Sequence, residues 1–239
     1  MKILAIETAT EACSVALILN DQLSDKLVSR FQLAPREHTK LILPMMDEVL
    51  EEANIDLKDL SAIAFSRGPG AFTGLRIASG VAQGVALSVD IPVVAVSTLS
   101  ALALQAHLFD KTANIIIAAL DARMGEVYWA IFKIQDGNIV LKGEENVSKP
   151  ELMLEAALSK QEESATIIGT GWDAYTEALF EEAIPSNIRY LKQQYPQADA
   201  IAKLAVPLFK EGKAVAPENA QPVYIRNKVA EKSKNLPEH

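Results

Sequence analysis

This sequence of 239 residues nearly lacks cysteine and lacks long apolar runs and any secretion signal. Cys13 is its single cysteine, which excludes an internal disulfide and is typical of a reducing compartment. No apolar run reaches the roughly 18 residues that a membrane helix needs, and the longest, such as 114–120, have the length of a strand. The N-terminus has no signal-peptide pattern. We therefore expect a cytoplasmic protein without a membrane segment.

A surplus of basic residues is also missing. The formal net charge is −8 at pH 7, and the sequence pI is about 5.0. Affinity for nucleic acid comes largely from neutralising phosphates, so the chain is a poor candidate for an independent RNA binder. A solvated terminus explains the basic residues after Tyr224 better than an RNA contact does; these are Arg226, Lys228, Lys232 and Lys234.

Strand and helix signals occur twice in the same order, strand–strand–strand–helix–strand–helix. The first half predicts strands at 2–9, 13–20 and 26–33, a helix at 37–53, a strand at 61–66, a helix at 72–89, a strand at 93–97 and a helix at 98–108. The second half predicts strands at 114–123, 126–135 and 137–148, a helix at 150–159, a strand at 165–171 and helices at 172–180 and 198–211.

This order resembles the α/β plan of the actin-like ATPase (ASKHA) fold, which has two related βββαβα halves and a nucleotide between them. We expect the halves to comprise residues 1–110 and 111–239. In that fold the last helix, 198–211 here, often packs back on the first half.

The turns that would hold phosphate in this fold are degenerate. Active members carry an acid and a glycine after the first strand of each half, because glycine lets the backbone reach phosphate oxygens. Here both turns keep the acid and lose the glycine. The segment 169–171 suits a loop on the adenosine side of a nucleotide, but it is equally an ordinary strand–helix turn. We predict weak nucleotide binding without turnover, at Glu7, Thr8, Asp121, Arg123, Gly169 and Gly171.

The most distinctive segment is a glycine-rich turn between a strand and a helix. Its spacing fits neither a P-loop nor a dinucleotide fingerprint. A tight turn that brings the helix close to the sheet explains the glycines but not the two arginines beside them. The motif residues are Arg67, Gly68, Pro69, Gly70, Phe72, Thr73, Gly74 and Arg76.

Two helices of the first half carry more apolar residues than one face packed on a sheet would bury. Between 73 and 89, Arg76 is the only charged residue, and the helix at 37–53 carries apolar residues on two stripes. Large surplus apolar surfaces usually mark a partner site, although mutual packing inside the monomer is the alternative. We predict a dimer interface at Leu43, Met46, Leu50, Ile77, Gly80, Val81 and Gly84.

The sequence resembles the TsaB (YeaZ) family, strongly over the first 130 residues and loosely beyond. Five stretches carry the resemblance: 6–8, 36–44, 67–77, 121–123 and 222–224. The family normally has Ser where Ala71 stands and Gly where Ser79 stands, both small exchanges.

The resemblance implies a non-catalytic scaffold and dimerisation subunit that acts with the transferase TsaD and the ATPase TsaE. Together they form threonylcarbamoyl on adenosine-37 of tRNAs that read codons starting with A. It further implies a homodimer in isolation, contact with tRNA only through the complex, and no tightly bound cofactor. ATP or ADP would lie at the interface with the partner.

The transferase relative binds its metal with two histidines four residues apart on the helix after the VVAVS-like strand. Here the corresponding segment, 97–103, has no histidine, and His38, His107 and His239 have no ligand spacing. We therefore expect no metal site.

Three other functions stay as alternatives. An independent actin-like kinase or ATPase would depend on Glu7 and Asp121. A metallo-endopeptidase would need a bound metal. Catalysis by Cys13 is the most remote, because a small buried cysteine is commoner.

Overall fold

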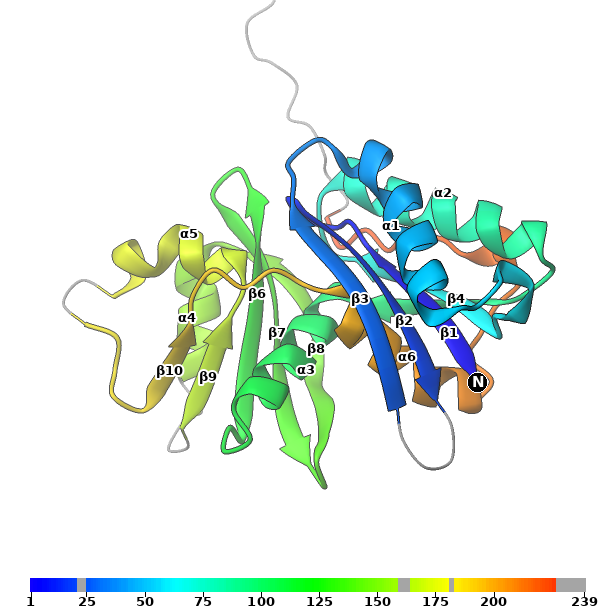
Figure 1. Cartoon of the computed structure of the whole chain (residues 1–239). Helices are drawn as coiled ribbons and strands as arrows, with labels where there is room; N and C mark the ends of the chain where they lie inside the picture. Colours follow the sequence, from blue (N-terminus) through cyan, green and yellow to red (C-terminus); the bar gives the residue numbers. More distant parts are fainter. Residues whose placement is uncertain (21–24, 159–163, 181–182, 227–239) are drawn as a thin grey trace, which may run out of the picture.

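The computed structural model describes residues 1–20, 25–158, 164–180 and 183–226. Each half is an α/β unit built on a five-stranded sheet, and the two sheets stand beside each other in Figure 1. This is the actin-like fold that the order of elements predicts. No helix within these ranges is both long enough and apolar enough to cross a membrane.

The first half follows the predicted order. Its elements are β1 (Lys2–Glu7), β2 (Ala12–Asn20), β3 (Asp25–Leu33), α1 (His38–Ala53), the short 3-10 helix η1 (Leu57–Asp59), β4 (Ala62–Gly68), α2 (Phe72–Ser88), β5 (Val93–Ser97) and α3 (Thr98–Phe109). The strand order is β3-β2-β1-β4-β5, with β1 antiparallel to β2 and parallel to β4.

The second half has the corresponding sheet order, β10-β9-β6-β7-β8. Its elements are β6 (Ile115–Arg123), β7 (Glu126–Gln135), β8 (Asn138–Ser148), α4 (Pro150–Leu158), β9 (Ala165–Ile168), α5 (Thr170–Leu179), β10 (Ile188–Leu191), α6 (Ala198–Lys210) and the 3-10 helix η2 (Pro217–Asn219). The sequence did not predict β10, because a four-residue strand with an exposed arginine gives almost no periodic signal.

Both faces of the first sheet are covered, which explains why β1 reads as a continuous apolar run. Leu4 and Ile6 pack in the core beneath α1 and α2, whereas Ile3 and Ala5 pack in the core beneath α6. All four side chains are fully buried. The alternation along one strand therefore builds two cores at once.

Two helices each pack on the sheet of the other half. Leu99 and Leu102 of α3, which precedes the second sheet in the chain, pack with Phe132 of that sheet. Ile201 of α6, which follows the second sheet, packs in the core of the first sheet. Each half thus receives a helix from the other half, and the chain position near 110 does not separate the two cores.

Candidate functional site

The glycine-rich turn, residues 67–76, packs directly on the turn that follows β1. Thr8 Oγ1 donates a hydrogen bond to the Gly74 carbonyl oxygen at 2.7 Å. A Cβ at Gly74 would lie 1.9 Å from the Thr8 carbonyl oxygen, and one at Gly70 would lie 2.6 Å from the Ala9 carbonyl oxygen. The glycines are required because two stretches of backbone touch here, which confirms the tight-turn interpretation.

The second half repeats this arrangement at the start of α5. Gly169 has a φ of 106°, and a Cβ there would lie 2.3 Å from the Ala119 carbonyl oxygen. A Cβ at Gly171 would lie 2.9 Å from the Ala119 Cβ. Both glycines therefore bring α5 against β6, as in an ordinary strand–helix turn.

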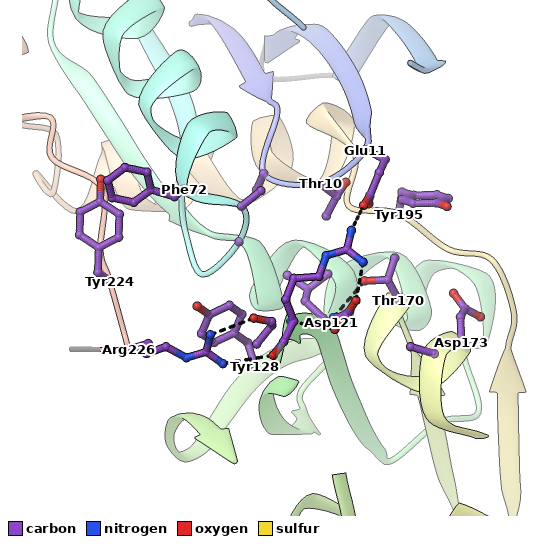
Figure 2. A pocket seen from close by; sticks show the side chains of 17 residues that line it. Thr10, Glu11, Phe72, Asp121, Tyr128, Thr170, Asp173, Tyr195, Tyr224 and Arg226 are labelled. Carbon is purple, nitrogen blue, oxygen red and sulfur yellow. Dashed lines mark hydrogen bonds and ion pairs between the residues drawn. The ribbon is translucent and has the colours of Figure 1, made fainter. Parts of the chain in front are cut away.

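A cavity of about 580 Å³ lies between the two halves. Figure 2 shows Thr10 and Glu11 on the wall that belongs to the first half, opposite Asp121 and Thr170 of the second half. Of the six residues predicted to contact a nucleotide, only Asp121 and Arg123 line this cavity.

Arg123 connects the two walls. Its Nη1 donates to Asp121 Oδ2 at 2.8 Å within the second half, and its Nη2 donates to Glu11 of the first half. Because two carboxylates already neutralise this guanidinium, a phosphate group would have to displace them. Arg123 thus acts as an ion-pair bridge across the cavity and is not a free anion receptor.

Glu7 and Thr8 are fully buried and do not line the cavity, which corrects the prediction that they contact a nucleotide there. Glu7 Oε1 accepts a hydrogen bond from the Ala9 N–H at 2.5 Å, and Oε2 has no hydrogen-bond partner among the described residues. Burial raises the pKa of Glu7 to about 7, although the bond from Ala9 acts in the opposite direction. Glu7 is therefore a proton-binding group beneath the glycine-rich turn.

The last described residues, 221–226, form a segment that we call the C-terminal strap. Its backbone donates a hydrogen bond to the Arg67 carbonyl oxygen at 2.7 Å. The Tyr224 ring lies 5.4 Å from the Phe72 ring, and the Arg76 guanidinium lies 3.8 Å above the Phe72 ring. Arg76 Nε also donates to Tyr224 Oη at 3.3 Å. The Arg76 side chain, which a tight turn left unexplained, therefore holds the strap, whereas Arg67 contributes only its backbone carbonyl oxygen to it.

Arg67 makes a second contact, with the other half. Its Nη2 donates to Glu145 Oε2 at 3.1 Å, and the Ser97 hydroxyl donates to the same carboxylate. The Glu145 side chain is only 10% exposed. This ion pair fixes β8 against the ends of β4 and β5, so Arg67–Glu145 joins the two halves in addition to Arg123–Glu11.

Arg226 is the last residue of the strap, and its side chain contacts the second half. This position corrects the interpretation of Arg226 as a solvated residue. Its side chain is 15% exposed, donates to the Ala122 carbonyl oxygen at 3.1 Å and pairs with Glu126. Its guanidinium carbon lies 5.8 Å from the centre of the Tyr128 ring, an approach seen in Figure 2. The other three basic residues of the tail, Lys228, Lys232 and Lys234, lie outside the described residues.

The sequence analysis did not identify several side chains that line the cavity. The only signal for any of them was the family-like stretch 222–224, which gave no role. They are Thr10, Glu11, Tyr128, Asp173, Tyr195 and Tyr224.

A second surface, on the outer side of α2, contains four of the predicted interface residues. We call Ile77, Gly80, Val81 and Gly84 the α2 strip. Gly80 and Gly84 are exposed, and a Cβ at either would meet no atom within 4 Å. Ile77 and Val81 are half-buried, and Leu43 of α1 is 50% exposed. Five of the seven residues predicted for a dimer interface are therefore at least partly exposed, four on α2 and one on α1.

Met46 and Leu50 do not belong to that surface. They are only 3% and 7% exposed and pack in the core with Ile42, Val49 and Phe65. For these two residues the alternative of packing inside the monomer is correct, because the stripe of α1 that carries them faces the sheet.

No group of three His, Cys, Asp or Glu side chains in the described parts of the chain is placed to hold a metal ion. Ser97, the first residue of the segment 97–103, caps α3 by accepting a hydrogen bond from the Ser100 N–H at 3.1 Å. His38 Nε2 lies 2.9 Å from the Thr10 carbonyl oxygen and 3.1 Å from that of Ala12. His38 thus ties the start of α1 to the turn after β1, while His239 lies outside the described residues.

Comparison with known proteins gives consistent names. The family model described as "TsaD: tRNA N6-adenosine threonylcarbamoyltransferase" matches residues 31–234. The protein TsaB of Escherichia coli K12, named for tRNA threonylcarbamoyladenosine biosynthesis, is 45% identical over 96% of both chains. TsaB of Haemophilus influenzae is 36% identical over 96% of this chain and 95% of its own.

A solved structure of YeaZ from Pseudomonas aeruginosa superposes with a TM-score of 0.82. It is 40% identical and covers 93% of this chain and 99% of its own. The similarity thus extends over nearly the whole length in both sequence and structure. The chain belongs to the TsaB (YeaZ) family of tRNA threonylcarbamoyladenosine biosynthesis proteins.

Proposed function

We propose that the chain is a non-catalytic scaffold and dimerisation subunit in the biosynthesis of threonylcarbamoyladenosine. It is required, with a TsaD-type transferase and a TsaE-type ATPase, for forming threonylcarbamoyl on adenosine-37 of tRNAs that read codons starting with A. The observation that carries this proposal is the α2 strip, an exposed helix face with two glycines and no covering element among the described residues.

The α2 strip has the geometry of a close helix–helix contact. Gly80 and Gly84 stand one turn apart, so they share a face and leave bare backbone there. A partner helix can approach such a face to the short end of the usual interaxial distance, roughly 8 Å. Ile77, Val81 and Leu43 supply the apolar border of that contact.

The partner that this face fits is another member of the same fold. The family model that matches 31–234 is the one described for the transferase, so chain and transferase share an architecture with a comparable helix pair. In isolation the same face joins a second copy of this chain, and the homodimer gives way to the heterodimer when the transferase is present.

The cavity between the halves supports a non-catalytic role. Both arginines that line it are paired with carboxylates, Arg123 with Glu11 and Asp121 and Arg226 with Glu126. The buried Glu7 does not line the cavity. No nucleotide is held tightly in this subunit, and ATP or ADP binds at the interface with the partner. With a net charge of −8, the chain reaches tRNA only through the complex.

Substitution of the α2 strip tests the proposal. Gly80→Arg and Gly84→Arg place an unpaired charge between two helices, which we expect to weaken the dimer roughly 100-fold. Leu152→Arg is the matched control, because Leu152 is 55% exposed on α4 of the other half. Sedimentation equilibrium measures the dimer dissociation constant, and circular dichroism checks that the variant monomers stay folded.

Reconstitution with the transferase and the ATPase supplies the functional measurement. Both glycine variants should lose modification of tRNA while Leu152→Arg keeps it. Full dimerisation and full modification by Gly84→Arg would refute the interface, and magnesium-dependent ATP turnover by the purified chain alone would refute the non-catalytic role.

A further inference from the structure

The second sheet ends in an unpaired strand. β10 pairs only with β9, in parallel, so one side of its backbone has no strand partner among the described residues. Figure 1 shows β10 at the outer edge of the sheet, on the side of the molecule away from α1 and α2. Unpaired strand edges are the sites at which extended peptides add to a sheet.

A groove of about 670 Å³ runs between this strand and the end of α3. Ile168 and Leu191 form its apolar base. Leu108 and Phe109 form its wall and are 41% and 69% exposed. Such exposure is unusual beside a strand edge, because apolar residues there invite association.

The rim of the groove is cationic. Arg189 and Lys192 line it, and none of the other lining residues is charged. Arg189 pairs with Asp110, so Lys192 supplies the charge that a partner can meet. The positive charge of this rim is opposite in sign to the net charge of −8 that the whole chain carries. Short strands and edge lysines usually protect a sheet against indiscriminate pairing. Protection alone would not place a largely exposed Phe109 next to the strand, so the charges select a partner and the apolar wall holds it.

The strand is held in a defined position before any partner arrives. Tyr190 Oη donates to Asp173 Oδ1 at 2.6 Å, and the Gln193 N–H donates to the same oxygen at 2.9 Å. Arg189 Nη1 lies 2.9 Å from Asp110 Oδ2. A preformed edge lowers the cost of ordering when a peptide binds.

From the unpaired strand, the apolar wall and the cationic rim, we infer that β10 and its groove dock an extended acidic segment of a partner protein. The segment adds as a sixth strand along β10. Its alternate apolar side chains enter the groove beside Phe109, and its carboxylates meet Lys192, because Arg189 already pairs with Asp110. The surface is separate from the α2 strip, so both are occupied in one assembly.

A synthetic peptide tests this docking surface. The probe is acetyl-Glu-Val-Asp-Leu-Glu-Val-Glu-amide, and its control carries Lys at each acidic position. We expect the acidic peptide to shift the backbone amide NMR signals of 188–192 and 108–109 in the full chain. The lysine peptide should bind at least 10-fold more weakly. No shift at millimolar acidic peptide, or equal binding of both peptides, overturns the inference.

Two variants locate the contacts. Lys192→Glu should weaken the acidic peptide roughly 10-fold, and Phe109→Ala should weaken it at least 3-fold. Both side chains are exposed, so the fold is retained, and Lys210→Glu on α6 is the control that leaves binding unchanged. If hexauridylate shifts the same amides and the acidic peptide does not, the groove is a nucleic-acid surface and the inference is wrong.

Discussion

Replacing Glu7 by Gln should remove a pH dependence from the stability of this protein. Glu7 is fully buried, and its pKa rises from an ordinary 4.5 to about 7 in the folded chain. Below pH 4.5 the carboxyl is protonated in both folded and unfolded chains, so it costs nothing. Above pH 7 it is ionised in both, and the folded chain carries the full cost of a buried charge. The free energy of unfolding therefore falls as the pH rises through this window.

The magnitude follows from the two pKa values. Their separation corresponds to about 3 kcal/mol, of which roughly 2–3 kcal/mol is lost between pH 5 and pH 8. Gln keeps the oxygen that accepts the Ala9 N–H and never ionises. Cys13 is the titratable neighbour of Glu7, and its own pKa is raised to about 11, so it stays neutral across this range.

Urea unfolding of both proteins at pH 5, 6, 7 and 8 measures the effect. The stability of the Gln variant minus that of the natural chain should rise by about 2–3 kcal/mol from pH 5 to pH 8, since every other titrating group cancels in the difference. Parallel stability curves for the two proteins would refute the reasoning, because they would mean that Glu7 is ionised or solvated in the folded state at all of these pH values.

Two further changes probe the close packing and the strap. Gly74→Ala should destabilise the fold by at least about 3 kcal/mol, because its Cβ would lie 1.9 Å from the Thr8 oxygen. Gly80→Ala is its control, made in a Gly84→Arg background in which the proposed dimer is absent. It should stabilise that monomer by up to about 1 kcal/mol in thermal unfolding, since its Cβ meets open space on an exposed helix face. Arg226→Ala leaves Glu126 without its partner and should cost about 1–3 kcal/mol. Hydrogen exchange should then show faster opening of the strap, and unchanged exchange there would contradict its role.

The order of strands and helices was predictable because local patterns are strong in this chain. The buried runs of β1 and β6 and the glycine-rich turn before α2 each carry a signal within about ten residues. β10 was missed because it is short and its pairing with β9 comes from distant residues. Sequence periodicity cannot report a partner strand that lies about twenty positions away.

The cavity was less predictable than the fold. The sequence singled out Asp121 and Arg123 from their place after a strand, but it gave no means to see that Glu11 of the other half neutralises Arg123. It also gave no means to tell Met46, which is buried, from Leu43, which is exposed. Both are apolar residues on one helix, and only the angle at which α1 meets the sheet separates them.

The exchange of α3 and α6 between the halves has a consequence for synthesis on the ribosome. The first sheet is translated early, but the face that Ile201 covers stays bare until α6 has emerged near the end of the chain. Long-range closure of this kind slows folding and lengthens the exposure of apolar strands. The nascent first half therefore exposes an apolar sheet face during most of translation. We expect molecular chaperones to bind this part of the protein.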